Sequence, residues 1–256
     1  MNYEFIEYSN TQGIVRININ RPDKRNALAQ GLMQELVTAF EAINEDETAR
    51  VVILSGNGKT FVAGADIEKM SQLDAPGYMD YGSLFNKMIK TIRENNKPVI
   101  AAVNGVAFGG GNVLALACDI IVAADVAKFS QPEIHLGIFG GGALLPQLIG
   151  RYRAAEIVLL GDAYSAQEAK EMGLVNKVVP LAELENTVLS MAQKICAKSP
   201  LAVKLGKKTV LTGTYNNLNT ATDHNLALMS VMFGSQDQKE GMKSFLEKRT
   251  PVFTGR

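Results

Sequence analysis

Three short segments of this chain combine small residues with groups that could take part in chemistry. They are residues 61–67 (FVAGADI), 104–111 (NGVAFGGG) and 129–134 (FSQPEI), the last followed by glycines 140–142. Each follows a strand-like run. Small residues let a ligand approach the main chain closely, and backbone N–H groups at the start of a helix converge on negative charge. The segments therefore predict a ligand site that uses backbone donors, and the third contains one carboxylate, Glu133.

The glycine cluster at residues 105–111 does not match either common nucleotide-binding motif. A dinucleotide fingerprint needs the order G-x-G-x-x-G after the first strand and an acidic residue about 20 positions later. Here three glycines are consecutive and lie in the middle of the chain. A Walker loop ends in Lys-Ser or Lys-Thr, whereas Asn112 and Val113 follow these glycines. A tight turn that packs a helix would use the same composition, so the cluster alone does not identify a ligand.

Histidine and cysteine are too few for most metal or nucleophile chemistry. Only His135 and His224 are present, without a paired Cys/His spacing, so we expect no zinc site and no other metal. Without a nucleophile-elbow pattern, a serine or cysteine hydrolase is poorly supported. Cys118 and Cys196 cannot form a disulfide scaffold, and they are predicted to be buried free thiols, as in a reducing compartment.

The hydrophobic pattern predicts the elements that position these segments. Residues 5–8 and 14–19 are strand-like around a turn signal at 11–13, and residues 27–44 form an amphipathic helix. Short apolar runs, separated by helical segments, are typical of crossover units with mostly parallel strands. These runs are residues 51–54, 99–103 and 120–123, with a helical stretch near 77–95.

From about residue 145 onward the pattern becomes helical. Helical periodicity covers residues 154–160, 165–172, 181–197, 201–211, 222–233 and 239–247. Ser165 and Glu168 fit a capping box, and Gly173 fits the matching stop at the C-terminal end of that helix. We therefore predict an α/β core domain over residues 1–195, followed by a C-terminal helical region over residues 196–256.

The composition excludes several classes of partner. The 256 residues include 26 basic and 26 acidic side chains, and a zero net charge argues against a broad surface for nucleic acid or membrane. No apolar run approaches the roughly 20 residues that cross a bilayer. The first ten residues contain Glu4 and Glu7, where a secretory signal would be basic and then apolar. We expect a cytoplasmic protein.

Several motifs together carry a resemblance to a known family. In chain order they are Asn20-Arg21-Pro22, Asn26-Ala27-Leu28, Ala63-Gly64-Ala65-Asp66-Ile67, Lys97 to Gly105, Gly109-Gly110-Gly111, Cys118-Asp119-Ile120 and Gln131-Pro132-Glu133. In this order the chain resembles the crotonase (enoyl-CoA hydratase/isomerase) superfamily almost from end to end. The resemblance implies an α/β fold, a crotonase-like spiral of ββα units with a C-terminal helical trimerisation region. It also implies a homotrimer or a hexamer of two trimers.

The resemblance also implies a set of site residues. The main-chain N–H groups of Ala65 and Gly110 would bind a thioester oxygen, Glu133 would move protons, and Gly141 fits a glycine that follows. The substrate would be an acyl-CoA thioester, with no cofactor besides the coenzyme A that it carries. Coenzyme A contacts would come from Lys24, Arg25, Ala27, Ala63, Asp66, Ile67 and Lys248. Lys248 matches a lysine that meets the coenzyme A phosphates, often from a neighbouring subunit. The alternative is that Lys248 is an ordinary solvated charge at a helix end.

One departure from the family pattern bears on the reaction. Hydratases of the family have two glutamates, and the first of these positions is occupied by Val113, which cannot accept a proton. The proline and threonine expected around residues 140–145 are also absent. A positioned base contributes about 10²–10⁴-fold to a rate, so ordinary hydration should be weak. Double-bond isomerisation needs only one carboxylate and is favoured.

Other interpretations of the same residues stay open. A specialised hydratase or dehydratase and a decarboxylase use the same fold, and a catalytically silent acyl-CoA-binding subunit belongs to another class. A carrier-protein thioester could replace free acyl-CoA. Glu133 could instead be a solvated loop residue, whereas a pocket carboxyl should have a raised pKa. The residues that could replace the missing glutamate are His135, if its segment is extended, and Glu68, Asp80, Tyr78 and Tyr81.

Overall fold

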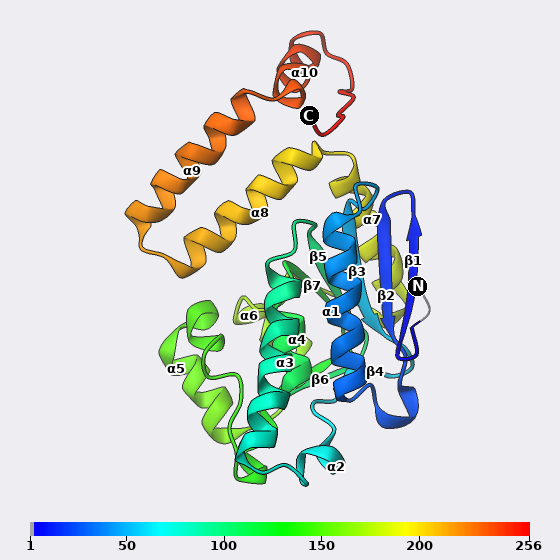
Figure 1. The fold of residues 1–256 in the computed structure, drawn as a ribbon, viewed down its shortest axis with the longest axis vertical. Coiled ribbons are helices and arrows are strands. Elements are labelled where there is room, and N and C mark those ends of the chain that lie inside the picture. The colour runs from blue at the N-terminus through cyan, green and yellow to red at the C-terminus, as the bar shows by residue number, and fades with distance from the viewer. Residues whose placement is uncertain (1–2) are drawn as a thin grey trace.

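A six-stranded β-sheet forms the centre of the fold, which the computed structural model describes for residues 3–256 (Figure 1). In their order across the sheet, its strands are β1 (Ile6–Thr11), β2 (Ile14–Ile19), β3 (Val51–Gly56), β5 (Val99–Val103), β7 (Ile120–Ala124) and β10 (Lys177–Val179). β1 and β2 pair antiparallel around a turn at Gln12 and Gly13, whose φ angles are 53° and 83°. The other neighbouring pairs are parallel, which confirms the predicted pairing.

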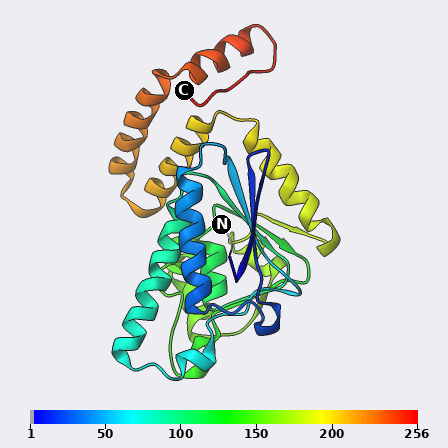
Figure 2. The same cartoon turned by 45° about the vertical axis from the view of Figure 1, so that its right-hand side comes forward.

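Both faces of this sheet are covered by helices. α1 (Gln30–Glu45) and α3 (Ala75–Arg93) lie on one side and α7 (Leu184–Cys196) on the other (Figure 2). Alternate residues of β3 point to opposite faces, so that Val52 and Leu54 join the core under α1 while their neighbours join the core under α7. Because both faces are buried, the strand is a continuous apolar run rather than an alternating one.

A second, smaller sheet was not predicted by the hydrophobic pattern. Its order is β4-β6-β8-β9, and the first three strands are parallel. They are β4 (Thr60–Val62), β6 (Val106–Phe108), β8 (Lys128–Ser130) and β9 (Tyr164–Ser165). Strands of two or three residues are too short to show a period, and three of them lie within the segments that first suggested chemistry. The spacing of those segments is therefore set by β-pairing.

The remaining elements of the core are short, apart from α5 (Leu145–Leu160), which has 16 residues. They are the 3-10 helices η1 (Pro22–Lys24), η2 (Pro132–Leu136) and η3 (Leu181–Glu183), with α2 (Ile67–Met70), α4 (Gly110–Leu116), α5 (Leu145–Leu160) and α6 (Ala166–Glu171). The capping box of Ser165 and Glu168 at α6 is confirmed. The predicted start of α1 at residue 27 is wrong, because Leu28 instead forms a parallel β-bridge to Ala65.

Three C-terminal helices project from one end of the core (Figure 1). α8 (Pro200–Tyr215) packs along α9 (Leu218–Phe233), and α10 (Gln236–Leu246) follows. The buried Lys207 of α8 forms an ion pair of 2.7 Å with Asp119 and donates to the carbonyl of Lys97 at 3.2 Å. This contact attaches α8 to the ends of β5 and β7, and the domain boundary after residue 195 stays a prediction.

The described residues contain neither a bilayer-spanning helix nor a cluster of metal-ligating side chains. No helix within residues 3–256 combines the length and hydropathy that a bilayer-spanning segment requires. The same part of the chain contains no group of three His, Cys, Asp or Glu side chains placed to hold a metal ion. Both cysteines are free thiols, as predicted, but each is only partly buried against a core cluster, so the prediction of full burial is wrong. Loss of solvation strongly raises the pKa of the Cys118 thiol.

Candidate active site

The three segments that suggested chemistry meet at one cavity. Because β4, β6 and β8 are parallel neighbours, the residues that follow them leave the small sheet at the same edge. They line a cavity of about 150 Å³ near α2 and the first turns of α3, low in Figure 1. Its lining includes Ala65, Gly109, Gly110, Val113, Glu133 and Gly140.

The backbone N–H of Ala65 is left without a partner by the pairing of its own segment. Leu28 donates to the carbonyl of Gly64 at 2.8 Å and accepts from the N–H of Asp66 at 3.3 Å. In such a parallel bridge, the flanking residues supply the bonds, and the N–H of the central residue points away. The Tyr81 hydroxyl also donates to the carbonyl of Leu28 at 3.1 Å, which fixes this segment against α3.

The backbone N–H of Gly110 is the first of helix α4 and has no intrahelical acceptor. The preceding Gly109 has φ 53° and ψ −121°, a conformation that a residue with a side chain rarely adopts, and its N–H donates to Ser130 at 2.8 Å. Within residues 3–256, the N–H groups of Ala65 and Gly110 donate to no protein acceptor. Two backbone donors are therefore available at one cavity.

The carboxylate of Glu133 is held between two glycines. An ideal Cβ placed on Gly109 would lie 2.6 Å from its Oε1, and one placed on Gly140 would lie 2.5 Å from the same atom. Its Oε2 is buried and has no hydrogen-bond partner among the described residues. Loss of solvation on burial raises the pKa of Glu133 above the ordinary value of 4.5. This is the direction expected for a carboxyl in a pocket.

The position at which the resemblance led us to expect a further glutamate is apolar here. Val113 lies one turn into α4, is partly exposed, and lines the same cavity as Glu133. Of the proposed substitutes, Tyr78 and Tyr81 also line the cavity, and burial raises the pKa of Tyr81 to about 12. Glu68 and Asp80 are exposed and do not line it. The lining therefore contains Glu133 as its one carboxylate among the residues that the structure describes.

His135 does not share the face of Glu133. His135 was expected to share that face only if its segment is extended, but Pro132–Leu136 is a 3-10 helix. His135 is exposed, is absent from the cavity lining, and its Nε2 points to Gly161, where an ideal Cβ would lie 2.8 Å away. The interpretation of His135 as the missing water activator is wrong for this geometry.

The residues predicted to contact coenzyme A form two adjoining groups near the cavity. Lys24, Arg25 and Ala27 lie in and after η1, and the Arg25 carbonyl accepts the N–H of Ala63 at 3.1 Å. Ala63 and the half-exposed Ile67 line the cavity itself. Asp66 precedes α2 and pairs with Arg21 at 3.4 Å, and Lys24 pairs with Glu68 at 3.4 Å. The loop after β2 is thus joined to the loop after β4.

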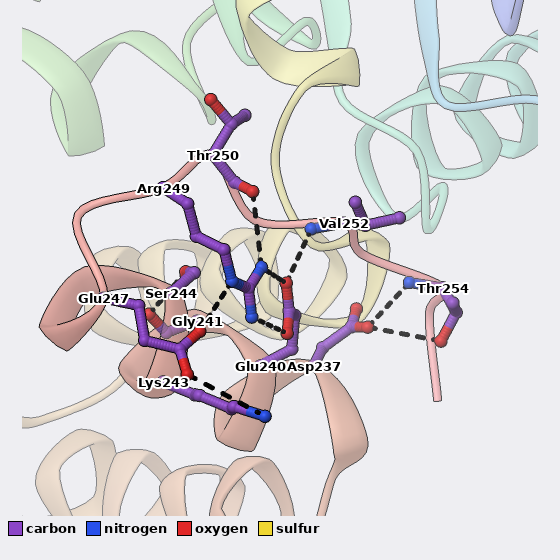
Figure 3. A network of polar contacts seen from close by, with 10 residues as sticks. All are labelled: Asp237, Glu240, Gly241, Lys243, Ser244, Glu247, Arg249, Thr250, Val252 and Thr254. Carbon is purple, nitrogen blue, oxygen red and sulfur yellow. Dashed lines mark hydrogen bonds and ion pairs between the residues drawn. The ribbon is translucent and has the colours of Figure 1, made fainter.

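Lys248 lies elsewhere, beyond α10 and at the opposite end of the molecule from α2 (Figure 1). It is exposed, has φ 53°, and adjoins a polar network shown in Figure 3. In this network Arg249 forms a bidentate pair with Glu240 at 2.6 and 2.8 Å, and hydrogen bonds from Arg249 and Val252 lower the pKa of Glu240 to about 2. The structure does not bring Lys248 to the cavity of its own chain.

Sequence reasoning named Tyr78 and Tyr81 but missed the other apolar walls of the cavity and one buried polar cluster behind it. Phe85 of α3 lines the same wall as these two tyrosines, at a spacing of three and four residues. That spacing is a helical-face signal and could have added Phe85. Met70, Leu136, Ile138 and Phe139 complete the walls. The polar cluster is formed by Asn112, Gln131 and Tyr164, which are distant in sequence and gave no signal.

Two unpaired backbone donors and a desolvated carboxylate at the edge of parallel strands are the arrangement of an enzyme that stabilises an oxyanion and moves protons. The family model of enoyl-CoA hydratase/isomerase matches residues 9–256, and the chain belongs to this family. The crotonase-type fold predicted from the resemblance is confirmed by the comparisons that follow.

Two curated relatives are a crotonyl-CoA hydratase of Syntrophomonas wolfei and a short-chain-enoyl-CoA hydratase of Clostridium acetobutylicum. The first is 42% identical over 257 residues and covers 99% of both chains. The second is 40% identical over 237 residues and covers 91% of both. A crystal structure of enoyl-CoA hydratase from Bacillus anthracis superposes with a TM-score of 0.95 at 37% identity, covering 99% of this chain and 100% of the other.

Proposed function

We propose that the protein converts acyl-CoA thioesters through an enolate whose oxygen is bound by the N–H groups of Ala65 and Gly110. The observation that carries this proposal is that both unpaired donors and the Glu133 carboxylate line one cavity. Enolisation of a thioester places negative charge on its oxygen, and fixed donors in a dry site stabilise it where it develops. Glu133 is the base, because it is the carboxylate that the lining provides.

Double-bond isomerisation is the reaction that one carboxylate supports best. Glu133 takes a proton from the α carbon of a 3-enoyl thioester, and the electron pair moves onto the thioester oxygen and along the conjugated carbons. The same carboxyl then returns the proton to the γ carbon, which gives the 2-enoyl thioester. No second acid or base is needed, in agreement with Val113 in the lining. Gly140, next to Gly141, lies against the carboxylate during this transfer.

Hydration is the second candidate, because the relatives from Syntrophomonas wolfei and Clostridium acetobutylicum have hydratase names. In this reaction water would add to a 2-enoyl thioester with Glu133 as the one acid/base group, which predicts a low rate. Decarboxylation uses the same enolate and remains distinguishable by its product. A silent acyl-CoA-binding subunit would keep the cavity without turnover.

A substrate panel tests these proposals directly. The purified protein is incubated with 3-enoyl-CoA and 2-enoyl-CoA, and products are followed by mass spectrometry and by the absorbance of the conjugated thioester. Isomerisation of 3-enoyl-CoA leaves the mass unchanged and raises this absorbance, whereas hydration adds the mass of one water. Glu133→Gln should abolish either turnover and leave coenzyme A affinity nearly unchanged. Retained full activity in that variant contradicts the assignment of Glu133.

Coenzyme A contacts and assembly complete the proposal. The group formed by Lys24, Arg25, Ala27, Ala63, Asp66 and Ile67 adjoins the cavity and would bind the coenzyme A part of the substrate, without a further cofactor. Lys248 would reach the phosphates from a neighbouring subunit of a trimer or hexamer in the cytoplasm. Lys248→Ala should then raise KM without changing kcat, and light scattering of the intact protein gives its oligomeric mass.

A further inference from the structure

Gln131 is a buried polar residue that the proposed reaction does not use. Its side chain lies behind the cavity with 1% of its surface exposed. A buried amide without hydrogen bonds costs free energy, so its orientation is set by the groups around it. Those groups belong to the segments around Gly109, Ser130 and Gly141.

The Gln131 amide connects three parts of the site. In the orientation that its neighbours satisfy, its nitrogen donates to the carbonyls of Gly109 and Ser130, each at 3.1 Å, and its oxygen accepts the N–H of Gly141 at 3.0 Å. Gly109 precedes the oxyanion donor Gly110, and both Gly109 and the Gly140 next to Gly141 contact the Glu133 carboxylate. One side chain therefore links the Gly109 segment to Gly141, the neighbour of Gly140.

The fully buried Asn112 amide lies behind Gln131. Its nitrogen donates to the Tyr164 hydroxyl at 3.0 Å, and it donates to the Gln131 oxygen at 3.0 Å only in the opposite orientation of the Gln131 amide. The Tyr164 ring stacks on Phe129 with 5.8 Å between ring centroids. Asn112 belongs to α4 and Tyr164 to β9, so the cluster connects the helix that begins at Gly110 with the outer strand of the small sheet.

We propose that Gln131 is a positioning residue that fixes the Glu133 carboxylate against Gly109 and Gly140 by tying both glycine segments to one buried amide. The inference rests on the proposed role of Glu133. Gln131 does not line the cavity and does not touch the reacting atoms. When its bonds are lost, the glycine segments separate, and the carboxylate takes a range of positions and becomes better hydrated.

The experiment compares Gln131→Met with the wild-type protein on the substrate that the panel identifies. Methionine keeps the length and shape of the side chain but makes none of the three bonds. Because a misplacement of about 1 Å costs on the order of 10²-fold, kcat should fall about 10- to 100-fold while KM changes less than about threefold. Because the Glu133 carboxylate becomes better hydrated, its pKa should fall, and the acid limb of the kcat profile should move to lower pH. Among residues 3–256 no charged side chain besides Glu133 lines the cavity, so the shift is assigned to Glu133.

Control variants separate positioning from general damage to the fold. Gln167→Ala on the exposed surface of α6 should keep wild-type kcat and its pH profile. Tyr164→Phe keeps the ring stack and removes one outer bond, so its kcat should fall less than that of Gln131→Met. Circular dichroism and thermal melting establish that each variant is folded. Where Gln131→Met is recovered only unfolded, Gln131→Glu, which keeps an acceptor for Gly141, is measured in the same way.

The outcomes distinguish this inference from the proposed function. A folded Gln131→Met with wild-type kcat and an unchanged acid limb overturns the positioning role, even when Glu133→Gln is inactive. A fully active Glu133→Gln overturns the proposed function and the inference with it. Loss of kcat with a shifted acid limb in Gln131→Met, beside an inactive Glu133→Gln, supports both.

Discussion

A single methyl group at residue 140 should reduce catalysis without unfolding the protein. The Cβ of alanine at this position would lie 2.5 Å from Oε1 and 2.7 Å from Cδ of Glu133. The backbone of Gly140 does not have a positive φ, so alanine adds no backbone strain there. Gly140→Ala therefore moves the proposed base and changes little else.

The size of the effect follows from these distances. Carbon atoms reach their best separation at about 3.5 Å, so the carboxylate must move by roughly 1 Å to accept the methyl group. A displacement of about 1 Å costs on the order of 10²-fold in rate, and we expect kcat to fall by about that factor. The moved atoms are the end of a flexible side chain, and replacing Gly by Ala reduces the entropy of the unfolded chain. Stability should therefore change by less than about 1 kcal/mol.

The matched control lies two residues away in the same loop. Gly142 has no positive φ, and its ideal Cβ has no atom within 4 Å, so Gly142→Ala makes the same chemical change in open space. Both variants are assayed for kcat and KM with the same enoyl-CoA and for melting temperature. If Gly140→Ala turns over as fast as Gly142→Ala, the carboxylate is not at the place where the reaction needs it, and the proposed mechanism is refuted.

Three further predictions follow from the site and from the contact of α8. Activity should fall as the pH decreases through the raised pKa of Glu133, because the base must be ionised. An acid limb of the kcat profile centred at or below 4.5 would contradict this. Val113→Glu should increase hydration of 2-enoyl-CoA at least about 10²-fold, measured by loss of conjugated absorbance, whereas an unchanged rate argues against a missing base. Lys207→Ala should lower the free energy of unfolding in urea by about 3 kcal/mol, because it leaves Asp119 without its partner; a change below about 1 kcal/mol would show that α8 is held otherwise.

Long amphipathic elements were predictable from the sequence because each buries one face. The stripe that begins at Leu32 and ends at Ile43 gives α1 its period, and the fully apolar β3 reflects burial on both sides. The capping box at Ser165 gave the start of α6 because the pattern is local. The start of α1 was not predictable, since Leu28 is taken from the helix by a long-range bridge to Ala65.

The parts of the fold and of the site that were not predictable depend on contacts between residues that are distant in sequence. The strands of the small sheet are short, and the parallel pairing of β4, β6 and β8 depends on crossover connections that no local hydrophobic period reveals. The Gln131 cluster joins residues 19 and 52 positions apart through side-chain amides and a hydroxyl, which the sequence does not distinguish from solvated ones. The wrong prediction for His135 could have been avoided from the local sequence. Pro132 at the first position of its segment favours a helical turn over an extended conformation.

The small sheet fixes the main-chain spacing of the site, whereas the side chains that follow its strands can differ. Neighbouring strands are about 4.8 Å apart, so the segment after β6 stands roughly that far from the segments after β4 and β8, which lie about 10 Å from each other. Main-chain pairing maintains these intervals whatever side chains follow the strands. A new reaction can therefore arise by exchanging one side chain, such as the one at position 113, while the main-chain geometry of the cavity is unchanged.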